Sequence, residues 1–123
     1  MDIAKQDITI KRGDDISRQI NFYRVKKEQG NKVRTRLDIS SLRRIDMHIK
    51  SNGKIQLRLS TEDKTILVKN KALGEVILVF KSSTTQKLKF TDGEYDMQFI
   101  TASGKIKTIL EGAFELDHDI TKV

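Results

Sequence analysis

The stretch that decides the fold class runs from residue 44 to residue 60 and reads RIDMHIKSNGKIQLRLS. On each side of its Asn52-Gly53 centre, every second residue is apolar, which is the period of a β-strand. We therefore expect a β-hairpin whose apolar face is formed by Ile45, Met47, Ile49, Ile55, Leu57 and Leu59. A two-residue turn would pair Ser51 with Lys54 and set inward residues opposite outward ones. We therefore expect a three-residue loop, Ser51-Asn52-Gly53, with Gly53 in the left-handed conformation.

The same alternation continues along the rest of the chain. Apolar residues recur in strand phase at Ile8 and Ile10, at Ile16, Ile20 and Phe22, at residues 65–69, and at Tyr95, Met97 and Phe99. After a turn at Leu73-Gly74, the continuous apolar run from Val76 to Phe80 predicts a central strand that is covered on both faces. Even-numbered apolar residues from Ile106 to Ile120 predict one long strand that bends at Gly112. Residues 82–88 are the one helical turn expected, with a serine cap.

Seven or eight short strands and no proline in 123 residues indicate an all-β chain, folded as an immunoglobulin-like antiparallel β-sandwich. Residues 1–123 are expected to form a single domain, because a chain of this length holds one core. Tyr95 opens a late strand two residues after Gly93, and Met97 takes the place of the second cysteine of antibody domains. This arrangement predicts a tyrosine corner.

Composition excludes several classes of protein. The chain has no cysteine, which excludes disulfide scaffolds and thiolate metal sites. No apolar run approaches the length of a membrane span, and the first residues lack the apolar core of a signal peptide. We therefore expect an intracellular product with no membrane partner.

Positive charge is concentrated in the first half of the chain. Up to Glu62 there are 15 basic and 8 acidic residues, whereas the remainder carries 9 of each. Residues 26–36 are expected to form an exposed hairpin tip that holds much of this charge. A charge cluster is a footprint for an acidic partner, although it also occurs on solvated loops. The candidate partner-binding residues are Arg24, Lys26, Lys27, Lys32, Arg34 and Arg36.

Catalytic and metal-binding patterns are scarce, and we expect no enzymatic activity, no metal and no cofactor. His48 falls on the polar phase of its strand and is interpreted as a surface residue. Strand alternation directs Asp117 and Asp119 to one side and His118 to the other, so these three cannot share an ion. Asp14-Asp15 is interpreted as a turn.

Nucleic-acid binding is the alternative function. It would combine the basic cluster with an aromatic platform, for which Tyr23 is the exposed candidate, although this ring can equally cover a neighbouring aliphatic chain. A receptor or sugar-binding role gains little support, because tryptophan is absent and exposed aromatic residues are few.

Seven short motifs between residues 37 and 121 give the chain a family resemblance. They are Leu37-Asp38-Ile39-Ser40 before the strand at Ile45, Gly74 before Val76-Ile77-Leu78, Thr84-Thr85-Gln86-Lys87-Leu88, Gly93-Glu94-Tyr95-Asp96-Met97, Gly104-Lys105-Ile106, Leu110-Glu111-Gly112 and Asp119-Ile120-Thr121. In layout these motifs resemble the small immunoglobulin-like proteins of long-tailed bacteriophages that occur in tail collars and upper baseplates. Residues 26–36 do not match that pattern.

The resemblance implies a non-enzymatic structural protein of the virion tail, made in the host cytoplasm. It also implies docking on a tail tube or baseplate hub, often as a homo-oligomeric ring. On this basis the expected partners are other phage tail proteins and copies of the same chain, and nucleic acid is not among them.

Overall fold

The computed structural model describes residues 4–117, which form eleven strands and one short helix. The strands are β1 (Ala4–Lys5), β2 (Ile8–Lys11), β3 (Ile16–Asn21), β4 (Tyr23–Glu28), β5 (Asn31–Arg36), β6 (Leu42–Ser51), β7 (Lys54–Ser60), β8 (Ile66–Asn70), β9 (Glu75–Phe80), β10 (Asp92–Thr101) and β11 (Ile106–Asp117). The helix α1 (Ser82–Thr85) is a single turn. No helix in the described range is long and apolar enough to cross a membrane.

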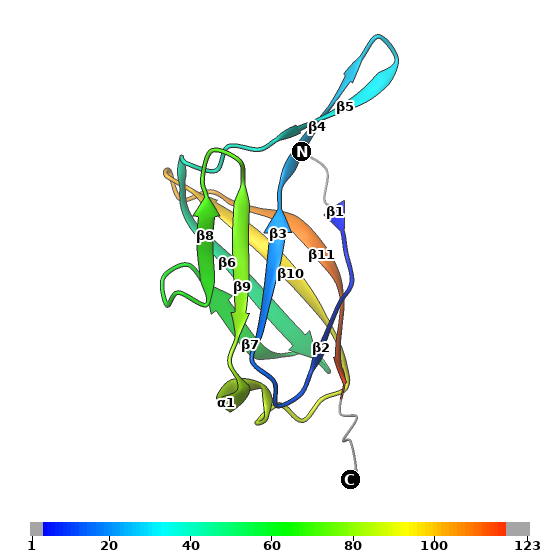
Figure 1. Ribbon diagram of the computed structural model, residues 1–123, viewed down its shortest axis with the longest axis vertical. Helices are drawn as coiled ribbons and strands as arrows, with labels where there is room; N and C mark the ends of the chain where they lie inside the picture. The colour runs from blue at the N-terminus through cyan, green and yellow to red at the C-terminus, as the bar shows by residue number, and fades with distance from the viewer. Residues whose placement is uncertain (1–3, 118–123) are drawn as a thin grey trace.

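Two sheets pack face to face, and the β4–β5 hairpin projects from one end of them (Figure 1). The larger sheet has the order β1-β11-β10-β6-β7, with β2 also paired to β11, and the smaller sheet has the order β3-β9-β8. Chain order therefore alternates between the sheets as in immunoglobulin domains, whose B, E and D strands form one layer and whose G, F and C strands form the other. The predicted all-β, immunoglobulin-like sandwich is confirmed.

The first strand is an interrupted edge. Ala4 lies opposite Leu110 and Ile8 lies opposite Phe114, so β1 and β2 both run parallel to β11 in one register. Counted as one edge, they bring the two sheets to eight strands, within the predicted range.

Strand β9 is central in its sheet, as the sequence predicts, but it is fully covered on one face only. Val76, Leu78 and Phe80 are buried in the core, whereas Ile77 and Val79 on the other face are half-buried. The prediction of burial on both faces, made from the continuous apolar run, is therefore wrong for the outer face. Within residues 4–117, no further layer covers the outer face of β3-β9-β8.

The turn predicted for the β6–β7 hairpin is wrong. Ser51 does pair with Lys54 across a two-residue turn, Asn52-Gly53, whose φ angles of 54° and 75° suit the mirror-image turns that hairpins favour. A β-bulge restores the phase, since Lys50 pairs with Ile55 and Ile49 with Leu57, which leaves one extra residue on β7. As a consequence Ile55 faces outward and is 47% exposed.

Strand β11 is one long strand, as expected, but its irregularity is not at Gly112. Met97 pairs with Leu110 and Gln98 with Thr108, so the extra residue is Ile109, and Ile106 is turned outward. Gly112 serves another purpose, because a Cβ there would lie 2.0 Å from the backbone oxygen of Gln6. The expected continuation to Ile120 lies outside the described residues.

Tyr95 does not form a tyrosine corner. Its hydroxyl donates a 2.5 Å hydrogen bond to the backbone oxygen of Gln6, between β1 and β2, instead of to a residue just upstream. Burial, together with the negative charge of Asp7, raises the pKa of Tyr95 to about 12. This buried phenol ties the N-terminal edge to the sheet.

We expect the stability of the protein to fall between about pH 10 and pH 12. The unfolded chain loses the Tyr95 proton near pH 10 and the folded chain only near pH 12, so the stabilisation is complete below pH 10 and is lost as the pH rises through this window. Urea unfolding at several pH values should show roughly 2 kcal/mol of extra loss in the natural protein relative to Tyr95→Phe. If the free energy of unfolding depended on pH equally in the two proteins, the result would contradict this account.

The predicted serine cap of the helical turn is absent. Lys81 occupies the N-cap without a side-chain bond, and Asp15 Oδ1 instead accepts a 2.7 Å hydrogen bond from the Ser82 amide. Asp14-Asp15 thus belongs to a connection, as interpreted, and Asp15 caps a helix that is distant in sequence.

Candidate partner-binding hairpin

The basic segment forms a two-stranded ribbon. Strands β4 and β5 are joined by Gln29-Gly30, whose positive φ angles of 51° and 80° give the tight turn that a two-residue connection requires. Every residue of both strands is exposed except Arg36, which is half-buried. The ribbon leaves and re-enters the sandwich at its base and otherwise stands free of it (Figure 1).

Register divides the six candidate partner-binding residues between the two faces of this ribbon. Tyr23 pairs with Arg36, Val25 with Arg34 and Lys27 with Lys32, so these six side chains share one face. Arg24 and Lys26 belong to the opposite face. The first face therefore carries four of the six cations, and we call it the cationic face.

Arg36 is a structural residue, which the sequence did not indicate. Its guanidinium forms an ion pair with Glu75, and its Nε donates a 3.0 Å hydrogen bond to the backbone oxygen of Leu73. Leu73 lies in the connection between β8 and β9, and Glu75 is the first residue of β9. Arg36 therefore fastens the base of the hairpin to the smaller sheet. This contact removes Arg36 from the cations that are free to meet a partner.

Tyr23 is covered by arginine side chains. The guanidinium carbons of Arg34 and Arg36 lie 4.2 and 5.2 Å from the centre of its ring. Such cation–π contacts occupy the ring surface that a nucleobase would need for stacking. The arrangement therefore fits the interpretation of Tyr23 as a structural side chain.

Apart from Glu28, which follows Lys27 in the chain, the hairpin offers the remaining cations no acidic side chain. Within residues 4–117, no ion pair within 4.0 Å involves Arg24, Lys26, Lys27, Lys32 or Arg34. Lys27 lies directly opposite Lys32, a like-charge pair that costs stability unless an anion approaches. Exposed Val25 and Val33, on opposite faces, add apolar area beside these charges. The ribbon is thus suited to bind an acidic surface.

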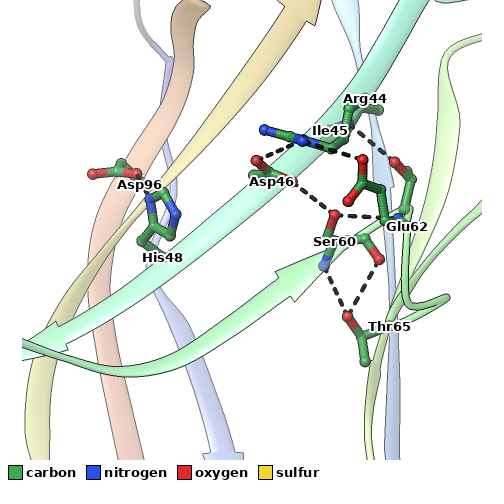
Figure 2. Close-up of polar contacts among 9 residues, drawn as sticks. Arg44, Ile45, Asp46, His48, Ser60, Glu62, Thr65 and Asp96 are labelled. Atoms are coloured by element: carbon green, nitrogen blue, oxygen red, sulfur yellow. Dashed lines mark hydrogen bonds and ion pairs between the residues drawn. The ribbon is translucent and has the colours of Figure 1, made fainter.

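A second polar cluster lies on the outer face of the larger sheet and was not singled out from the sequence (Figure 2). Asp46 is only 8% exposed and accepts hydrogen bonds from Arg44 Nε at 2.9 Å and Ser60 Oγ at 2.7 Å. Arg44 also pairs with Glu62, which raises the pKa of the guanidinium, with Asp46 as a further cause. Because its polar groups satisfy one another, the cluster is a structural link between β6 and β7.

His48 belongs to the same face and is more covered than expected of a surface residue. Its side chain is 19% exposed, and Nδ1 lies 3.5 Å from Asp96 Oδ1, an oxygen with no hydrogen-bond partner in the described range. Alternation on β6 placed His48 on this face correctly, but only the β6–β10 register brings Asp96 beside it.

No metal-binding group emerges from the described part of the chain. Residues 4–117 contain no cluster of three histidine, cysteine or carboxylate side chains that could hold an ion. His118 and Asp119 lie outside the described residues, so the arrangement expected for residues 117–119 stays a prediction.

Comparisons with known proteins identify no family. No family model matches the sequence, and no curated protein matches it. Among solved structures, CopC from Methylosinus trichosporium OB3b aligns with a TM-score of 0.41 at 10% identity, over 96% of this chain and 90% of that one. Extracellular domains 3–5 of Drosophila OTK align with a TM-score of 0.36 at 16% identity, over 98% of this chain and 34% of that one. The strand order of the chain itself defines its fold class.

Proposed function

We propose that this protein is a non-enzymatic structural component of a bacteriophage tail, a collar or baseplate ring subunit that docks on the tail tube or hub. The family resemblance of residues 37–121 supports this role. The observation that carries it is the β4–β5 hairpin, because a projecting ribbon with unpaired cations, fastened at its base by Arg36, is suited to reach an acidic neighbour in an assembly. In this role the protein is located in the virion.

The structure favours this role over nucleic-acid binding at one point. Tyr23 is the aromatic platform that the alternative requires, and its ring is already occupied by Arg34 and Arg36. Without an aromatic platform, non-specific binding of a basic ribbon to nucleic acid rests mainly on contacts with phosphates, and its affinity falls steeply as salt increases. A gel-shift series over several salt concentrations checks this alternative, and tight binding at physiological salt would support it.

Reversing the free cations should exclude the protein from particles. We define the hairpin-reversed variant as Lys27→Glu, Lys32→Glu and Arg34→Glu, which leaves the Arg36 anchor in place. Its incorporation into purified particles, measured by quantitative mass spectrometry, should fall at least about tenfold, because like charges at an interface strongly oppose binding.

The matched control changes the charge equally at three exposed lysines away from the hairpin, Lys54→Glu, Lys64→Glu and Lys87→Glu. It should be incorporated normally. Normal incorporation of the hairpin-reversed variant would overturn the proposed role of the hairpin.

A further inference from the structure

Acidic side chains gather on the outer face of the larger sheet, along its two central strands. Asp92 pairs with Glu115, Asp96 with Glu111, and Glu94 with Ala113, so alternation directs all five carboxylates to one face. We call this set the acidic stripe: Asp92, Glu94, Asp96, Glu111 and Glu115. It holds five of the nine carboxylates that follow Glu62. The net charge of that half of the chain is zero, so the sequence did not indicate this cluster.

Most of the stripe lacks a close ion pair, although Lys5 lies opposite Glu111 and Lys50 lies opposite Glu94 on the neighbouring strands. In the range 4–117, Asp96 is the one carboxylate of the stripe with a basic side chain within 4.0 Å, namely His48 at 3.5 Å and Lys50 at 3.9 Å. Asp92 and Glu115 lie directly opposite each other without such relief. Like charges at cross-strand positions are destabilising, so the stripe, like the Lys27–Lys32 pair of the hairpin, gains stability when an opposite charge approaches.

A shallow hollow of about 550 Å³ lies within the stripe. Small residues, Gly93, Gly112 and Ala113, contribute to its lining, and Glu94, Asp96 and Glu111 supply carboxylates, with Lys5 and Lys50 also present. The surface is therefore recessed where its negative charges are close together.

The acidic stripe and the hairpin share one spacing. Both are antiparallel pairs of strands, in which side chains on one face recur about every 7 Å along the strand. Lys27 and Lys32 form one row of the cationic face and Arg34 lies in the next, while the stripe has rows at Asp92–Glu115, Glu94 and Asp96–Glu111. The two sets of charges are therefore complementary in sign and in interval.

The hairpin does not lie over the stripe of its own chain. It projects from the end of the sandwich at which β10 terminates and β11 begins, whereas Asp92 and Glu115 lie toward the opposite end (Figure 1). Contact between them therefore requires two copies in a head-to-tail arrangement, which closes into a ring or extends as a filament, depending on the rotation between copies.

We propose that the cationic face of the hairpin in one copy docks on the acidic stripe of the next copy. This inference rests on the proposed function and names one interface of the ring. A single hairpin covers a small area, so the contact is weak and sensitive to salt. Assembly on a tail would strengthen the binding by combining several such contacts.

The test is sedimentation velocity of the purified chain at about 50 mM and about 500 mM NaCl. The natural protein should associate at low salt and be monomeric at high salt. The hairpin-reversed variant and a stripe-reversed variant, Glu94→Lys, Glu111→Lys and Glu115→Lys, should each weaken association by on the order of a hundredfold. The lysine control with Lys54, Lys64 and Lys87 reversed should associate like the natural protein.

An equimolar mixture of the two reversed variants provides the decisive measurement. Each natural hairpin then meets a natural stripe and each reversed hairpin meets a reversed stripe, so association should return in the mixture. Circular dichroism checks that each variant is folded. A natural protein that is monomeric at both salt concentrations, or a mixture that fails to associate, would overturn the proposal.

The results separate this interface from the proposed function. If the natural chain stays monomeric but the hairpin-reversed variant is excluded from particles, the hairpin binds another tail protein and only this inference fails. If self-association follows the charges but incorporation does not, the interface stands and the proposed function fails.

Discussion

Replacing Phe114 with alanine is expected to lower the free energy of unfolding by about 4 kcal/mol, the largest effect that we predict for a single residue. Phe114 is completely buried on β11, and its ring centre lies 5.9 Å from that of Phe80 on β9 in the other sheet. A third ring, Phe90, lies 6.1 Å away. Alanine would leave a cavity between the layers that these aromatic residues cannot close without moving both sheets.

Urea unfolding followed by circular dichroism measures this loss. The matched control is Ile106→Ala on the same strand, where the side chain is 63% exposed, and it should change stability by less than about 0.5 kcal/mol. Similar losses at the two positions would show that the aromatic contact does not hold the layers together.

Gly74→Ala is expected to cost about 3 kcal/mol, for a reason that concerns the backbone. At this position φ is +64°, and a Cβ would lie 2.2 Å from the backbone oxygen of Leu37. Gly74 also accepts the amide hydrogen bond of Phe22, so it contacts the chain on both sides of the hairpin base. The substitution should therefore loosen the hairpin as well as the sandwich.

Gly53→Ala separates the two causes of this effect. Its φ of +75° imposes a similar conformational cost, but nothing lies within 4 Å of an added Cβ. It should lose only about 1 kcal/mol in the same urea experiment. A loss at Gly53 as large as that at Gly74 would assign the effect to backbone conformation alone. Hydrogen exchange of β4 and β5 amides should accelerate in Gly74→Ala.

Alternation in the sequence predicted most of the fold. A period of two is a local property, so it located the strands and the apolar residues that form the core, including Met47, Met97 and Leu116. The basic hairpin was also predictable, because its cations are adjacent in the chain.

Positions that depend on register were not predictable. The extra residues at Gln56 and Ile109 reverse the phase of their strands, and nothing local in the sequence marks them, so Ile55 and Ile106 were assigned to the wrong face. The anchor role of Arg36 and the pairing of Tyr95 with Gln6 arise from contacts between distant segments.

The acidic stripe was hidden for a related reason. Its carboxylates come from two strands separated by a turn, and lysines elsewhere in the same half of the chain cancel their charge in any sum. Only the pairing of β10 with β11 brings these five carboxylates together on one surface.

The interrupted N-terminal edge has a consequence for synthesis of the protein. Strands β1 and β2 complete the larger sheet by pairing with β11. Ala4 therefore cannot pair until Leu110 has been synthesised. Until β11 has been synthesised, this first segment stays unpaired, and contacts of such long sequence separation form slowly. The closure of this edge is therefore a late step, which begins only once β11 has emerged from the exit tunnel.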